Sequence, residues 1–186
     1  MKFVVHLLLL TLLSALSGAA WVAQRPVDER GEVESADSPV VDVGEQIRQA
    51  TIKRTAVVDI SEGTLNRYLS DRLSGEMREE ISDYVAFDGL SVDLHDGWAR
   101  FDLEWKLGGQ RRTVSVSVSV SREGDVFRVH VNGGAYGRLE VIRGFLRPMV
   151  PTFQRVSAVF EKEIGQLFRM NKVEIQEGRL VLDPRF

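Results

Sequence analysis

Strict alternation of apolar and polar residues between positions 90 and 131 constrains this chain more than any other feature. It is plainest at residues 114–121, where four valines alternate with four serines. The turn sequences Asp96-Gly97, Gly108-Gly109 and Glu123-Gly124-Asp125 interrupt it. Successive side chains of a β-strand point to opposite faces, and turns of this kind join antiparallel neighbours. The pattern predicts a four-stranded antiparallel meander with one apolar and one polar face.

A second pattern, between Met149 and Phe168, has the period of an α-helix. Its apolar residues fall on one half of a helix and its basic residues close to the opposite side. Pro148 and Pro151 suit a first turn, where a missing N–H costs nothing. At helical rise these residues would form a rod of ~30 Å. We therefore predict one long amphipathic C-terminal helix.

Three further elements complete the expected fold. A strand is predicted over residues 52–60, and Ser61 can cap a helix over residues 61–77. Residues 173–175 and 180–182 are predicted to form a last hairpin. Together with the meander this gives about seven strands.

The expected widths of sheet and helices predict curvature. A flat seven-stranded sheet would be ~34 Å wide, whereas two helices side by side cover only ~20 Å. We therefore predict an α+β fold, with a strongly curved antiparallel sheet of about six to seven strands wrapped around the long C-terminal helix and a shorter helix near residues 61–77. Its elongated interior could hold an apolar ligand or be packed solid with aromatic side chains.

The N-terminus has the organisation of an export signal. Lys2 precedes an apolar segment, and small residues at 17–20 could be a cleavage site. Residues 1–23 are therefore predicted to be a signal peptide or, in the alternative reading, a membrane anchor of sufficient length. Residues 24–45 are acidic and predicted to be a flexible linker. Residues 46–186 are predicted to form a single α+β domain.

Composition excludes several functions. The chain has no cysteine, which rules out disulfides and thiolate chemistry, and its net charge of −3 argues against a nucleic-acid binder. His95 and His130 fall on the polar face of strands without acidic neighbours at ligand spacing, so no metal site and no cofactor are expected. The sequence has no nucleophile elbow and no phosphate-binding loop. The expectation is an exported, non-enzymatic protein that is either in the periplasm of a bacterium or anchored in the membrane and facing the periplasm.

Two segments suggest a family resemblance. They are Ile60-Ser61-Glu62-Gly63-Thr64-Leu65-Asn66-Arg67-Tyr68-Leu69 and the terminal Lys172-Val173-Glu174-Ile175-Gln176-Glu177-Gly178-Arg179-Leu180-Val181-Leu182. In this order of elements the chain resembles, over about residues 52–186, the YceB-like exported envelope proteins, which are similar to half of a tubular lipid-binding (TULIP-type) module. The resemblance implies a long helix wrapped by a highly curved sheet and a hydrophobic or lipid ligand. YceB-type members have a lipoprotein cysteine that this chain lacks, so anchoring by acylation is not expected.

The predicted site is a hydrophobic groove between the long helix and the apolar sheet face. Its predicted lining consists of Leu65, Leu69, Leu73, Phe101, Leu103, Trp105, Val116, Val118, Phe127, Val129, Phe153, Phe160 and Ile164. Arg138, Arg143 and Arg147 could form a basic rim for an anionic headgroup, or simply a solvated surface. The predicted function is binding of a lipid or other apolar molecule near a membrane. The alternative is a dry-cored structural or partner-binding module, for which the sequence identifies no protein partner.

Overall fold

The computed structural model describes residues 2–25, 42–54, 56–76, 85–124 and 126–185. It confirms the α+β class, the meander, the helix after Ser61 and the terminal hairpin. The elements are α1 (Lys2–Ala23), α2 (Val43–Lys53), β1 (Val58–Ser61), α3 (Glu62–Glu76), β2 (Val85–His95), β3 (Trp98–Leu107), β4 (Gln110–Glu123), β5 (Val126–Tyr136), β6 (Leu139–Val141), the 3-10 helix η1 (Arg143–Met149), α4 (Val150–Val159), α5 (Glu161–Leu167), β7 (Lys172–Gln176) and β8 (Arg179–Asp183).

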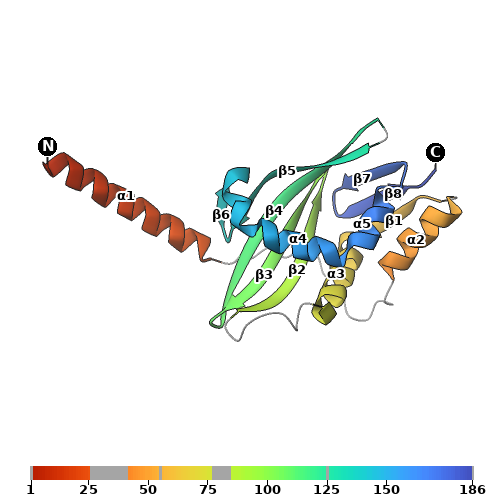
Figure 1. Cartoon of the computed structure of the whole chain (residues 1–186), viewed down its shortest axis with the longest axis horizontal. Coiled ribbons are helices and arrows are strands. Elements are labelled where there is room, and N and C mark those ends of the chain that lie inside the picture. The colour runs from red at the N-terminus through yellow and green to blue at the C-terminus, as the bar shows by residue number, and fades with distance from the viewer. Residues whose placement is uncertain (1, 26–41, 55, 77–84, 125, 186) are drawn as a thin grey trace.

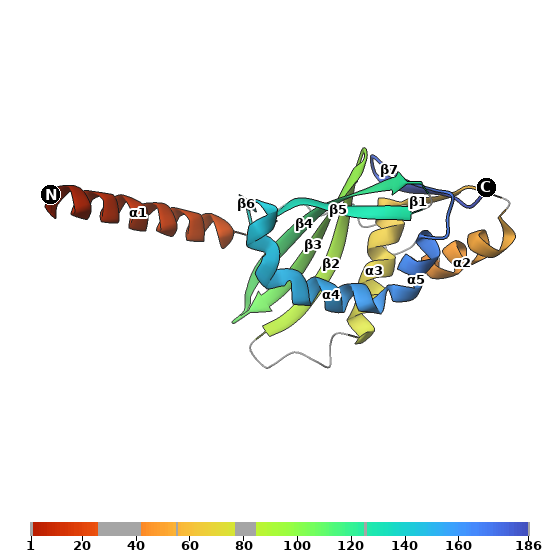
Figure 2. The same cartoon turned by 45° about the horizontal axis from the view of Figure 1, so that its top comes forward.

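The meander forms a five-stranded antiparallel sheet in the order β2-β3-β4-β5-β6, with the short strand β6 added at one edge. The sequence pattern did not predict β6. Helices α3 and α4 lie across one face of this sheet, here termed the inner face (Figures 1 and 2). The register places Val92 opposite Phe101 and Val118 opposite Val131, so the apolar residues of neighbouring strands share that face.

The prediction of one strongly curved sheet is wrong. Strands β1, β8 and β7 form a separate three-stranded sheet, and the five-stranded sheet is not curled. The two sheets meet at their turns, where Gly97 N–H donates to the Ile175 carbonyl and Gly178 N–H to the Leu94 carbonyl, each at 2.9 Å. A five-stranded sheet is only ~24 Å wide at ~4.8 Å per strand. Because the strands are divided between two sheets, neither sheet is wide enough to need to curl around the helices.

The prediction of one long C-terminal helix is also wrong, because the stretch from Met149 to Phe168 is broken at Phe160. Residues 143–149 form η1, and α4 ends at Val159, because the next residue, Phe160, has φ of −104° and ψ of 18°, which are not helical. Phe160 is buried in the core and its ring lies 6.4 Å from that of Tyr68 on α3. The break separates α4, which crosses the five-stranded sheet, from α5, which packs beside α2 (Figure 1). One straight rod could not cover both surfaces.

Helix α2 occupies a place where no helix was predicted. The Asp42 side chain caps it by accepting from the Glu45 N–H at 3.0 Å, and Val43 and Ile47 are buried against Ile60. The prediction of a strand from residue 52 is therefore wrong in its first part, since α2 continues to Lys53. The predicted linker, residues 24–45, falls mostly outside the described residues.

Side chains of α3 bond to the backbone of β2, the free edge of the five-stranded sheet. Asn66 accepts from the Val92 N–H at 2.6 Å and donates to the Val92 carbonyl at 2.9 Å. One turn earlier, Glu62 accepts from the Leu94 N–H at 2.7 Å. Ser61 caps the helix, as predicted, by accepting from the Thr64 N–H at 3.3 Å. In the motif Ser-Glu…Asn, the Glu62 and Asn66 side chains of the helix therefore bond backbone groups of β2 that have no neighbouring strand.

Two apolar clusters form the interior of the domain. The larger joins α3 and α4 to β2 and β3, and includes Leu73 and Leu103, both fully buried. The smaller joins α2 to the three-stranded sheet around Ile60 and Leu182. Between α3 and α5, the Tyr68 hydroxyl donates to Glu163 Oε1 at 2.7 Å.

Helix α1 projects away from the domain and its apolar side chains are exposed (Figure 1). By length and composition, Val4–Ala23 could cross a membrane, and a signal sequence near an N-terminus meets the same criteria. The C-terminal end of α1 contacts the turn between β5 and β6.

Candidate functional site

The inner face of the five-stranded sheet is covered on one half only. On the β2–β3 half, Val92 and Leu103 are 1% and 0% exposed beneath α3 and α4. On the β4–β5 half, Val118 is only half-buried and Val129 is 52% exposed. We term this strip the β4–β5 groove. Its floor consists of Val116, Val118, Val120, Phe127, Val129 and Val131, and α4 and α5 flank it.

Side-chain contacts close one end of the groove. The ring of Phe127 lies 6.2 Å from that of Phe168, at the end of α5. Beside them, Arg122 Nη1 donates to Asn171 Oδ1 at 2.5 Å and also to the Asn171 carbonyl. These contacts join the β4–β5 hairpin to the segment that follows α5.

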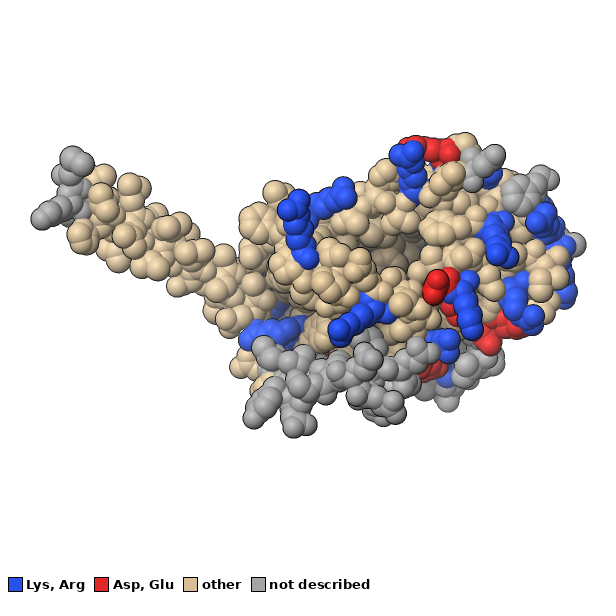
Figure 3. Space-filling model, viewed as in Figure 1, with Lys and Arg blue, Asp and Glu red and all other residues tan. Residues whose placement is uncertain are grey.

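The other end of the groove is closed by η1. Leu146 of η1 is 5% exposed and lies over Gly134 of β5, where a β-carbon would be only 3.0 Å from Leu146 Cδ1. Figure 3 shows a hollow between the β4–β5 hairpin and the helices α4 and α5, bordered mainly by uncharged residues. The arrangement is an elongated depression with an apolar floor, and such a floor is the usual character of a site for an apolar ligand.

The structure divides the predicted groove residues into two groups. Leu69, Leu73, Leu103 and Phe160 are buried in the solid core, and Leu65, Phe101, Phe153 and Ile164 are partly buried against it. Trp105 is half-buried near the far end of β3 and makes an edge-to-face contact with Phe87, with ring centroids 5.7 Å apart. Val116, Phe127 and Val129 lie in the β4–β5 groove, and Val118 lies at its border, partly buried against the core. The first group is therefore core, and the last group is what a ligand could reach.

Sequence reasoning omitted Val120, Val131 and Phe168 from the site. The two valines belong to the same alternation as Val118 and Val129, so the pattern contained the signal for them. Phe168 could be placed there only by knowing that the C-terminal stretch breaks at Phe160.

The three predicted rim arginines are not equivalent. Arg143 and Arg147 belong to η1 and are exposed, whereas Arg138, in the turn between β5 and β6, lines a depression on the opposite face of the sheet. A single rim containing all three does not form.

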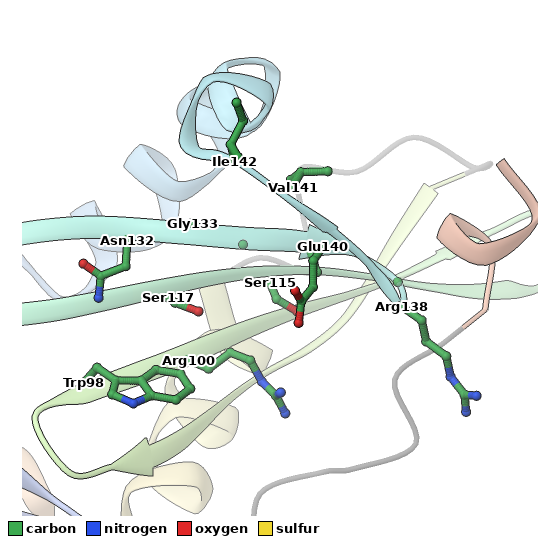
Figure 4. A pocket seen from close by; sticks show the side chains of 13 residues that line it. Trp98, Arg100, Ser115, Ser117, Asn132, Gly133, Arg138, Glu140, Val141 and Ile142 are labelled. Atoms are coloured by element: carbon green, nitrogen blue, oxygen red, sulfur yellow. The ribbon is translucent and has the colours of Figure 1, made fainter. Parts of the chain in front are cut away.

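That outer-face depression has a volume of about 1080 Å³ and was not predicted. Figure 4 shows Arg100, Ser115 and Glu140 pointing into it, with Trp98 and Asn132 at one side. Glycine residues 133, 134 and 137 form part of its wall, which keeps that wall free of side chains. Its lining mixes charged and polar side chains with apolar ones, among them Trp98, Val141 and Ile142.

Polar residues beneath this depression are buried although the alternation placed them on the wet face. Asp102 is 4% and Ser115 2% exposed. Arg100 lies between two carboxylates, with Nη2 3.0 Å from Asp93 Oδ2 and Nε 3.4 Å from Asp102 Oδ2. Burial raises the pKa of Asp102, against the opposing effects of Ser115 and Arg100. The charged form of Asp102 is therefore disfavoured in the fold.

Asp102→Asn is expected to increase the free energy of unfolding at neutral pH. A raised folded-state pKa means that Asp102 lowers stability as pH rises above its ordinary value of 3.8. The neutral amide removes this loss, so the gain in stability of the variant over the wild-type protein, measured by urea unfolding, should grow as the pH rises through the acid range. Asp88 is the control of opposite sign, because Lys106 and Arg111 lower its pKa. Asp88→Asn should lose stability at neutral pH, and the same direction of change in both variants would contradict this account.

Among the residues that the structure describes, no three His, Asp or Glu side chains gather as metal ligands would. His95 does have acidic neighbours, contrary to expectation: its Nε2 lies 3.2 Å from Asp93 Oδ2 and its Nδ1 3.4 Å from Glu177 Oε1, and its ring stacks on Trp98 with centroids 4.2 Å apart. His130 Nε2 lies 3.1 Å from Ser121 Oγ.

Comparison with known proteins places the chain in no family. No family model matches it, and no curated protein matches it either.

Proposed function

We propose that this chain is an exported envelope protein that binds a lipid acyl chain or a similar apolar molecule in the β4–β5 groove. The observation behind the proposal is the exposure of the groove floor, above all of Val129. Burying a valine side chain contributes on the order of 1.5 kcal/mol. Six apolar side chains in one strip would therefore gain several kilocalories per mole from a ligand that covers them.

The shape and chemistry of the groove favour an elongated occupant without charge along its length. The floor follows β4 and β5, and its ends are bounded by Phe168 and Leu146. Arg122 and Asn171 lie at one end, where they bond to each other. The resemblance to YceB-like proteins points to the same ligand class, and α1 agrees with a place in the cell envelope, either after export or at the membrane.

The test uses adjacent residues on opposite faces of β5. Because the chain has no cysteine, Val129→Cys and His130→Cys can each be labelled with one fluorophore in the full chain, reconstituted in lipid nanodiscs. A spin-labelled fatty acid should quench the label at position 129 strongly and saturably, and the label at position 130 weakly. The two positions are adjacent along β5, so fatty acid that merely partitions into the bilayer should affect them to a similar degree.

Equal quenching at the two positions would refute the groove as a binding site. That result would favour the alternative, a protein whose apolar strip is only an incompletely covered sheet face. Val129 is exposed, so its replacement should leave folding intact, and circular dichroism should verify this.

A further inference from the structure

The end of the domain nearest α1 exposes large apolar side chains. Ile142 and Phe145 are 73% and 64% exposed, and Ile142 is the most exposed large apolar residue in the described part of the chain. They lie at and within η1, which Figures 1 and 2 place beside β6 at the α1 end of the molecule. Apolar side chains so exposed in adjoining turns indicate a surface that meets another apolar phase.

Basic side chains accompany them. Arg143 and Arg147 are exposed and lie four residues apart on η1, on either side of Phe145 in sequence. The backbone of η1 is fixed to the sheet from within, because Leu146 packs over Gly134 and the Tyr136 hydroxyl donates to the Phe145 carbonyl at 2.9 Å. The segment therefore presents two apolar and two cationic side chains from a supported backbone.

The end of α1 is attached to this same edge of the domain. Arg112 Nη1 donates to the Gln24 carbonyl at 2.8 Å, and the Arg138 N–H approaches the Val22 carbonyl at 3.4 Å. A β-carbon at Gly137 would lie only 2.3 Å from the Arg25 carbonyl, so the chain passes closely over that glycine. If α1 crosses a bilayer, the surface of that bilayer would therefore lie beside β6 and η1.

The residues at this end of α1 suit a membrane–water boundary. Trp21 lies under the Arg25 guanidinium, 3.6 Å from the ring centroid. Tryptophan concentrates at bilayer interfaces, and arginine extends from there toward the headgroups.

We propose that α1 is retained as a membrane span and that η1 rests on the surface of the same bilayer. In this arrangement Ile142 and Phe145 enter the interface, and Arg143 and Arg147 meet anionic phospholipid headgroups. Arginine suits this role because its guanidinium binds phosphate with two parallel hydrogen bonds. The surface and the β4–β5 groove are separate sites, so either one could fail experimentally without the other.

The test places one environment-sensitive fluorophore on the full chain, at Phe145→Cys or at Val126→Cys. The two residues are similarly exposed, at 64% and 62%, and Val126 is the first residue of β5, next to the β4–β5 turn and away from η1. The chain is reconstituted in vesicles of phosphatidylcholine and phosphatidylglycerol that contain lipid spin-labelled high on the acyl chain. The label at position 145 should be quenched several-fold more strongly than the label at position 126.

A second comparison tests the charges. Adding Arg143→Gln and Arg147→Gln to the Phe145→Cys chain should weaken quenching several-fold in vesicles with phosphatidylglycerol and change it little in phosphatidylcholine alone. Equal quenching at positions 145 and 126 would overturn the docking surface, and quenching insensitive to both arginines would overturn the anionic contact. An intact mass showing that α1 is lost from the isolated protein would overturn the retained span.

Discussion

Asn66→Ala is expected to lower the free energy of unfolding by about 3 kcal/mol, because a buried backbone donor and acceptor each lose their partner. Asn66 is 3% exposed and bonds to both the N–H and the carbonyl of Val92, which is itself 1% exposed. Alanine has a higher helix propensity than asparagine, so the substitution by itself would stabilise the helical conformation of α3. Any loss in stability therefore measures the bonds to β2.

Ser70→Ala is the matched control for this prediction, since Ser70 is an exposed residue of the same helix. Its effect should stay within about 0.5 kcal/mol in urea unfolding. An Asn66→Ala protein as stable as the Ser70→Ala protein would show that α3 is not held to the sheet edge by this side chain.

Gly134→Ala is expected to be comparably damaging, at about 3 kcal/mol, because overpacking against backbone cannot be relieved by a rotamer change. The added β-carbon would lie 2.1 Å from the Ser115 carbonyl oxygen and 3.0 Å from Leu146 Cδ1. Either β5 must separate from β4 or η1 must move off the sheet. Both changes would open the end of the groove that Leu146 closes.

The neighbouring Gly133 provides the control for the same strand. A β-carbon there would meet only the Val141 carbonyl, at 3.4 Å, an ordinary contact. Thermal unfolding should therefore place Gly133→Ala close to the wild-type protein and Gly134→Ala well below it. Similar melting temperatures for the two variants would contradict the close packing of η1 on Gly134.

Local patterns predicted most of the elements of this fold. The strand predicted from the alternation at residues 114–121 depends only on pairing with its two neighbours along the chain. The observed pairing of β4 with β3 and β5 confirms it. The Ser61 cap and the Glu177-Gly178 turn are likewise determined by residues close in sequence. Interactions of this range can be read from a sequence directly.

The division into two sheets and the break at Phe160 could not be predicted in the same way. The apolar stripe from Met149 to Phe168 continues across the break, because α4 and α5 both need an apolar face toward different neighbours. Nor does the sequence distinguish Val92, which is buried, from Val129, which is exposed, since both are valines in alternating strands. Their difference depends on where α3 and α4 lie over the sheet, which is a property of the whole fold.

The most direct test of the central claim is to identify what occupies the β4–β5 groove in cells. A photoreactive benzoylphenylalanine at position 129, or at position 130 as the control, is incorporated into the full chain in a bacterial host and irradiated before lysis. Mass spectrometry of the intact purified protein should find an adduct of lipid mass on the Val129 variant and none on the His130 variant. Adduct-free protein at position 129, or equal labelling at both positions, would contradict a lipid-binding groove.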